Sequence, residues 1–208
     1  MTQNDLQSER KRLVQMAMQL IDRRGAEVGK TTLASEAQMS RSRIDAVFPE
    51  ESDLFDAILE DWYAPDIAIM EEVLDSDLPI QRKFFEFFAR RFARERDRFR
   101  KDPASFALYV ELGTARMEQV RGYIDLADHY MSILVAQAQA EGFFADLKID
   151  KAMSLINQMV ICYTSPQVMM MLDERLTEEK LGAIIDTLFA GLSGKESSAR
   201  GVAGLKLA

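Results

Sequence analysis

Apolar residues recur along almost the whole chain at the three- and four-residue spacing of an α-helix. Strand signals are nearly absent, because the sequence has no long β-branched alternation and no Asn-Gly or Asp-Gly hairpin pair. The spacing therefore predicts an all-α fold. The expected helices cover residues 6–24, 31–37, 40–48, 51 onward with a kink at Pro65, 79–101, 103 onward, 116–140, 148–172 and 177–192.

Two short helices joined by a tight turn follow the first long helix. Thr31 or Thr32 is predicted to cap the first of them and Ser40 the second, because hydroxyl side chains accept hydrogen bonds from free helical N–H groups. Pro49 ends the second at Phe48, since the residue before a proline disfavours helical geometry. Such a pair is typical of a helix-turn-helix, which needs small residues at the helix crossing and apolar anchors beneath the outer helix. The residues that fit this requirement are Leu33, Ala34, Ala37, Met39, Ile44 and Val47.

The start of the outer helix carries residues suited to a DNA groove. Guanidinium groups match guanine and phosphate acceptors, while hydroxyls and helix N-terminal amides bind phosphate. The candidate DNA-contact residues are Lys30, Thr31, Thr32, Ser40, Arg41, Ser42 and Arg43. A short helix pair is also a common packing device, so the pattern alone does not separate a DNA-binding head from a structural unit.

This segment resembles the TetR/AcrR family of transcriptional repressors. The resemblance covers RKRLVQMAMQLIDRRG as the first helix and LASEAQMSRSRIDAVFPEESDLFDAIL as the head and the entry to the fourth helix. The positions that match the family pattern are Leu33, Ala34, Ala37, Met39, Ser40, Arg41, Ile44 and Phe48. The resemblance implies a three-helix DNA-binding head over residues 1–50 and a larger helical ligand-binding and dimerisation body over 51–193. It also implies an effector cavity whose occupation moves the fourth helix and spreads two heads apart.

Three residues depart from the family pattern. Gln38 stands where the family prefers glycine, so a positive φ there would carry roughly 1 kcal/mol of strain. Asp45 stands in place of a tyrosine and Glu51 in place of a lysine, both of which touch phosphates in the family. Each lost ionic contact is expected to reduce the salt slope of DNA binding by about 0.9.

Charge is divided unevenly along the chain. The net charge is −8, but residues 1–49 hold 8 Lys and Arg against 6 Asp and Glu, whereas residues 50–208 hold 18 against 28. A mildly positive head on an acidic body is compatible with a DNA partner that meets only the head. The small, polar composition of residues 194–208 predicts a flexible tail.

Aromatic residues and methionines are abundant in the body, and most of them should form its core. Helical bundles often keep a pocket between helices, and methionine lets such a pocket adapt to apolar ligands. The candidate pocket residues are Trp62, Phe88, Tyr109, His129 and Tyr163.

Two opposite charge blocks lie next to each other in the body. Residues 50–77 hold 11 acids and no Lys or Arg, and residues 82–101 hold 9 basic residues against 3 acids. An ion-paired surface between the two helices is the favoured interpretation. The alternative is that Arg90, Arg94 and Arg98 recognise a carboxylate or a phosphate.

Enzyme chemistry is not expected. His129 is the only histidine and Cys162 the only cysteine, so no His-containing metal cluster or hydrolase triad can be assembled within the chain. No glycine-rich phosphate loop is present, and no metal or cofactor is predicted. His129 is expected in a pocket or core and Cys162 as a buried, inert thiol.

The last two predicted helices are more apolar than one subunit needs, which predicts a two-fold homodimer built on them. Residues 152–172 carry no charge but are diluted by polar side chains, so a buried helix is expected there and no membrane span. A single cysteine and a polar N-terminus favour the cytoplasm. The leading hypothesis is a ligand-responsive dimeric repressor that binds a pseudo-palindromic DNA operator and is released by a small apolar or amphipathic effector. The alternative is a helical protein of the same fold that binds a lipid or small molecule without reading DNA.

Overall fold

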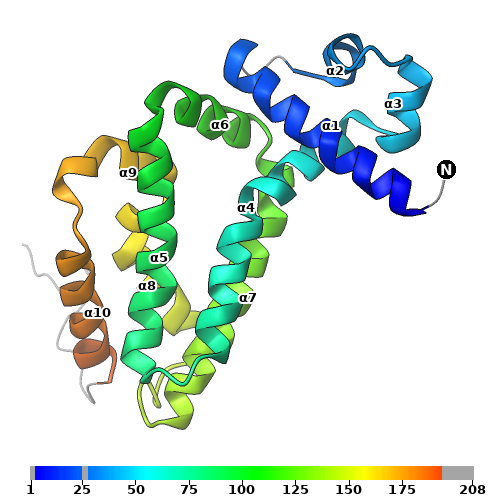
Figure 1. Cartoon of the computed structure of the whole chain (residues 1–208). Helices are drawn as coiled ribbons and strands as arrows, with labels where there is room; N and C mark the ends of the chain where they lie inside the picture. The colour runs from blue at the N-terminus through cyan, green and yellow to red at the C-terminus, as the bar shows by residue number, and fades with distance from the viewer. Residues whose placement is uncertain (1–2, 25–27, 194–208) are drawn as a thin grey trace, which may run out of the picture.

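The computed structural model describes residues 3–24 and 28–193, and the regular structure within these ranges is entirely helical (Figure 1). The all-α fold predicted from the sequence is therefore confirmed. The flexible tail predicted for residues 194–208 lies outside the described residues. The helices are α1 (Gln3–Arg24), α2 (Lys30–Glu36), α3 (Arg41–Val47), α4 (Glu51–Asp75), α5 (Ile80–Lys101), α6 (Pro103–Ala115), α7 (Met117–Ala140), α8 (Ile149–Thr164), α9 (Pro166–Leu172), the short 3-10 helix η1 (Asp173–Arg175) and α10 (Glu178–Leu192).

One helix prediction is wrong and involves a proline. The single helix expected over residues 148–172 is divided into α8 and α9, because Ser165 adopts extended geometry before Pro166 and caps α9 by accepting from Val168 N at 3.5 Å. In contrast, α4 continues as one helix through Pro65, which lies in its middle. The cap predicted at Thr177 is confirmed, since its Oγ1 accepts from Lys180 N at 3.2 Å.

A small hydrophobic core holds α1 to the two short helices (Figure 1). The predicted apolar face of α1 is completely buried, with Leu13, Ala17, Leu20 and Ile21 at 0% exposure. They pack with residues of α2, α3 and the first turns of α4, and Leu112 of α6 joins them from the body. The core of the head therefore extends past residue 50 and includes one side chain from the body.

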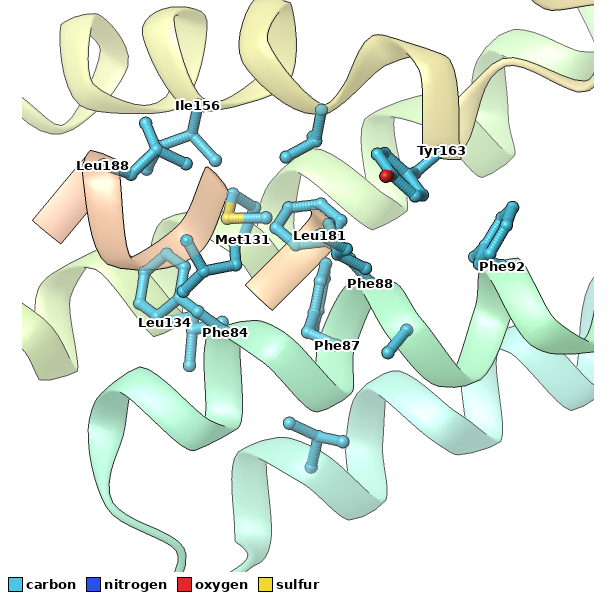
Figure 2. Close-up of a cluster of buried hydrophobic side chains, with 14 of the residues drawn as sticks. Phe84, Phe87, Phe88, Phe92, Met131, Leu134, Ile156, Tyr163, Leu181 and Leu188 are labelled. Atoms are coloured by element: carbon cyan, nitrogen blue, oxygen red, sulfur yellow. The ribbon is translucent and has the colours of Figure 1, made fainter. Parts of the chain in front are cut away.

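A second and larger core fills the body. Phe84, Phe87, Phe88 and Phe92 lie along one side of α5 and face α7, α8 and α10 (Figure 2). Their rings bury large apolar areas, and Phe84 meets Phe189 edge to face with centroids 5.1 Å apart. Helix α4 runs beside α7 and α5, while α6 crosses the end of the body below α1 (Figure 1). The head thus rests on α4 and α6.

The uncharged stretch at residues 152–172 forms α8 and α9 of the body. Within the part of the chain that the structure describes, no helix combines the length and the apolar character needed to cross a bilayer.

Candidate functional site

The turn between α2 and α3 has the geometry of a helix-turn-helix. Ala34 is buried at the crossing, and its carbonyl accepts from Met39 N at 3.0 Å, which closes the turn. Ile44 and Val47 are buried beneath α3 and anchor it to the head core. Gln38 has φ 53°, so the position that the family fills with glycine does require the left-handed region here.

The outer surface of α3 carries a group of exposed polar side chains. Ser40, Arg41, Ser42 and Arg43 are all exposed, as is Thr31 at the start of α2, while Thr32 is half-buried. Arg41 Nη1 donates to Thr31 Oγ1 at 2.5 Å, and the Ser40 and Ser42 hydroxyls lie 3.1 Å apart. Ser40 occupies the cap position of α3 without making a side-chain capping bond. The sequence-predicted contact residues, Lys30 apart, therefore lie at or near the surface formed by α2 and the start of α3.

Lys30 differs from the other predicted contacts because it is buried, with 4% exposure. Its ammonium donates to Phe48 O at 2.8 Å and to Pro49 O at 2.7 Å, and it lies 2.7 Å from Asp45 Oδ1. The ammonium thus satisfies two carbonyls just after the end of α3. Lys30 therefore holds the end of α3 against the start of α2 and does not face outward.

Asp45 and Glu51, the two acidic departures from the family pattern, have partners within the head. Asp45 bonds Lys30 and accepts from Arg41 Nε at 3.1 Å; the Lys30 bond is the main factor that lowers the pKa of Asp45. Glu51 Oε1 accepts from Lys30 N at 2.7 Å and so caps α2 in place of the predicted Thr31 or Thr32. A Cβ at Gly29, the N-cap residue, would collide with this carboxylate. Both acids thus stabilise the turn.

The two arginines at the start of α3 are also paired in the free protein. Arg43 Nη2 lies 2.8 Å from Glu9 Oε1 of α1, and Arg41 Nη2 lies 3.8 Å from Glu51 Oε2. The arginine side chains nevertheless keep 47% and 59% of their surface exposed, for Arg41 and Arg43 respectively. The pairs of Arg41 are exposed on both sides, and such pairs are weak and exchanged readily, whereas Glu9, the partner of Arg43, is only 10% exposed.

A cavity of about 410 Å³ lies inside the body, within the usual size range of small-molecule sites. Its walls come from α4, α5, α6, α7, α8 and the start of α9. Among the predicted pocket residues, Phe88, Tyr109 and Tyr163 line it. Trp62 does not; it is buried beside the cavity, stacked on Tyr109 at 4.1 Å between ring centroids. His129 is exposed on α7 and lies outside both the cavity and the core, contrary to expectation.

Charged residues form one wall of the cavity, which sequence reasoning missed. Asp66 is buried and receives Arg94 Nη1 at 3.0 Å; burial raises its pKa, and the arginine opposes that effect. Burial also raises the pKa of Glu95, which pairs with Arg94 and with Arg98 at 3.4 Å. The periodicity of α4 carried a signal, because Asp66 falls on the same face as the buried Trp62 and Met70.

The arginines of α5 resolve the two interpretations of the charge blocks. Arg90 pairs with Glu72 at 2.8 Å and Arg94 with Asp66, so both join α5 to α4. Arg98 lies over the Trp62 ring, with its Cζ 3.0 Å from the centroid. All three arginines that were proposed as an anion site are therefore occupied by protein partners, as the favoured ion-paired interpretation expects.

The cavity and the head are joined through α6. Tyr109 lines the cavity, and its hydroxyl donates to Met18 O of α1 at 3.1 Å. Ser105 Oγ, one turn earlier, donates to Asp22 Oδ1 of α1 at 2.6 Å. Tyr109 thus lines the cavity and also contacts α1, the first helix of the head.

Cys162 is half-buried on α8, in contrast to the fully buried thiol expected. Within residues 3–24 and 28–193, no group of three or more His, Cys, Asp or Glu residues is arranged to hold a metal ion.

A three-helix head with a helix-turn-helix, set on a helical body that encloses a cavity, defines the class of all-helical transcriptional regulators. Residues 81–185, half of the chain, match the family model described as "Tetracyclin repressor-like, C-terminal domain". The chain belongs to the TetR family of transcriptional regulators.

Solved structures share this fold at low sequence identity. A candidate transcriptional regulator from Pseudomonas aeruginosa PAO1 is 14% identical, with a TM-score of 0.68 and coverage of 90% of this chain and 91% of that chain. The fatty acid degradation regulator FadR from Bacillus halodurans is 17% identical, with a TM-score of 0.55 and coverage of 90% and 95%. A comparison with curated proteins finds no match.

Proposed function

We propose that the protein is a ligand-responsive, dimeric transcriptional repressor that binds a pseudo-palindromic DNA operator and is released by a small amphipathic effector. The observation that carries this proposal is the outer face of α3, where Arg41, Ser42 and Arg43 are exposed on a helix anchored by buried Ile44. A helix held in this way can enter a major groove while its inner face stays packed.

Arg41 and Arg43 would exchange their partners when DNA binds. Each now pairs with a carboxylate of the head, and a phosphate or a guanine edge offers the same bidentate geometry. Displacing the exposed pairs of Arg41 requires little free energy, since such pairs typically contribute about 0–1 kcal/mol. Arg43 would exchange Glu9, whose side chain is 10% exposed, for the stronger charge of a phosphate. Asp45 and Glu51 remain engaged with Lys30, which limits their repulsion of the phosphate backbone.

The proposed release mechanism uses Tyr109. An effector in the cavity would displace or reorient the ring of this residue, which is stacked on Trp62 of α4 and bonded to Met18 O of α1. Both helices carry the head, so a shift of α6 would change the position of α3 relative to a second copy. The coupling requires two states of this contact with different effector affinity.

The dimer is proposed to form through α8 and α10, which pack on each other and on α5. Met159 of α8 is exposed by 43%, and Met171 of α9 by 81%. Covering these side chains with a second copy would remove apolar surface from water and place two heads on one operator. Cytoplasmic localisation is part of the proposal, as expected of a repressor that acts on DNA.

A mobility-shift assay with the DNA flanking the protein's own gene tests the function, at low and at moderate salt. We expect sequence-selective binding that is lost in the double variant Arg41→Ala, Arg43→Ala. The matched control is Arg12→Ala, which removes an exposed arginine of α1.

No binding at any salt would favour the alternative, a TetR-fold protein that binds a lipid or small molecule without reading DNA. The observation that favours this alternative is that Arg41 and Arg43 of α3 already pair with carboxylates of the protein itself. A monomer in light scattering at micromolar concentration would refute the dimer separately.

A further inference from the structure

Arg91 is unlike the other arginines of α5. Within the residues that the structure describes, it has no carboxylate at ion-pair distance. The other six arginines of this helix each pair with a carboxylate; they are Arg82, Arg90, Arg94, Arg96, Arg98 and Arg100. Arg91 lines the cavity instead.

The guanidinium of Arg91 is held in place by its own helix. Its Nε donates to Phe87 O at 2.8 Å, and its Cζ lies 4.4 Å from the centroid of the Phe87 ring and 5.7 Å from that of Phe88. Tyr123 lines the same cavity; burial raises the pKa of its phenol, and the charge of Arg91 opposes that effect. A side chain fixed in this way loses little conformational entropy when a ligand binds.

Three carboxylates line the cavity together with Arg91, and each of them has another partner. Asp66 is paired with Arg94, and Glu95 is paired with Arg94 and Arg98, so neither lies within ion-pair distance of Arg91. Asp128, on the α7 side of the cavity, accepts from Asn157 Nδ2 at 3.1 Å.

We infer that Arg91 binds the carboxylate of a monoanionic effector whose remaining part is apolar. A monoanion matches the single charge of Arg91, whereas a phosphate monoester at about −1.5 to −2 would exceed it and be repelled more strongly by the carboxylates of the lining. This inference rests on the effector cavity of the proposed function and names the chemical class of its ligand.

The rest of the cavity suits an apolar body. Phe87, Phe88 and Met131 form buried parts of its wall. Its lining also includes Met117, Ile124 and Ile161, large apolar side chains that are 45%, 43% and 48% exposed and so reach the mouth. The ligand would place its carboxylate on Arg91 and extend its apolar part between α7 and α8.

Isothermal titration calorimetry on the full-length protein, with probes that differ only in the head group, tests this inference. Octanoate should bind, and octanamide and octylammonium should bind at least roughly tenfold more weakly, because only the carboxylate forms a charge-assisted pair with Arg91. Octyl phosphate should be weaker than octanoate. A parallel titration with 3-phenylpropanoate distinguishes an acyl from an aromatic body, and either result supports a carboxylate effector.

The variant Arg91→Gln should weaken octanoate binding at least roughly tenfold and leave octanamide binding unchanged, while Arg91→Lys should retain part of the affinity. The matched control is Arg90→Gln, which removes the adjacent arginine that pairs with Glu72 on the outside. Should Arg91→Gln fail to fold, the head-group series on the unmodified protein still decides the matter.

Equal or tighter binding of octanamide or octylammonium would overturn the inference, as would the absence of carboxylate binding at millimolar concentration. Carboxylate binding and operator binding can fail independently of each other. A protein that binds octanoate through Arg91 but no DNA would retain this inference and lose the proposed repressor. One that binds its operator but no carboxylate would do the opposite.

Discussion

Lys30→Met separates a structural role of Lys30 from a role in DNA contact. Methionine keeps most of the apolar stem in its buried position and removes the ammonium that donates to Phe48 O and Pro49 O. The Lys30 side chain is 4% exposed, and its bond to Phe48 O is buried while its bond to Pro49 O is part-buried. The loss should appear as weaker anchoring of the end of α3.

The magnitude follows from the two hydrogen bonds. A bond to a charged group contributes about 1.5–3 kcal/mol, so two of them give roughly 3–6 kcal/mol. Relief of the ammonium's desolvation offsets part of this, which leaves a net destabilisation of about 2 kcal/mol. No contribution is assigned to Asp45, whose carboxylate keeps 41% of its surface exposed. Since 1.4 kcal/mol is a factor of ten, protection of the local amides should fall about 30-fold.

Hydrogen exchange measured by mass spectrometry on α2 and α3 is the assay. Lys11→Met, at an exposed position of α1, is the control and should leave exchange unchanged. Unchanged exchange in Lys30→Met together with a loss of DNA affinity would refute the structural role and restore Lys30 as a surface contact.

Three further changes give measurable outcomes. Gln38→Gly should raise the free energy of unfolding by up to about 1 kcal/mol in urea denaturation, because φ is 53° at this position; a destabilised variant would show that the side chain contributes more than its strain. Tyr109→Phe removes the hydrogen bond to Met18 O but keeps the ring, so octanoate should still bind the cavity while it lowers operator affinity less than in the unmodified protein. An unchanged effect of octanoate on operator affinity would exclude Tyr109 from the coupling. Burial raises the pKa of Asp66 above 3.8, so ionisation of this carboxyl lowers stability as the pH rises through the raised value. Asp66→Asn should therefore gain stability relative to the unmodified protein as the pH rises above 3.8, and a difference that does not change with pH would contradict the shift.

Local patterns predicted most of the helices because each buries a continuous apolar face. The buried faces of α1 and α10 could be predicted from the sequence, since the spacing of apolar residues decides which side of each helix meets the core. The break at Ser165 was missed because its uncharged surroundings favoured one long helix, although Pro166 marked the boundary. Pro65 does not end α4, which continues as one helix from Glu51 to Asp75.

The site depended on pairings between distant residues, which spacing does not reveal. Lys30 looked like a DNA contact, yet its partners lie 15 to 19 residues further along the chain. Asp45 and Glu51 looked like lost phosphate contacts and are tied to Lys30 instead. The sequence spacing pointed to Arg90, Arg94 and Arg98 as an anion site and not to Arg91. Only the fold shows which of these arginines pair with a carboxylate.

The salt dependence of operator binding, followed by fluorescence anisotropy, tests the central claim most directly. The unmodified protein should bind one duplex selectively, and its affinity should fall linearly with salt on logarithmic axes. The double variant Arg41→Ala, Arg43→Ala should bind far more weakly, with a slope reduced by up to about 3.6, because the dimer loses four arginines that each release roughly 0.9 counterions. Equal affinity for the operator and a scrambled duplex at every salt concentration would contradict the account.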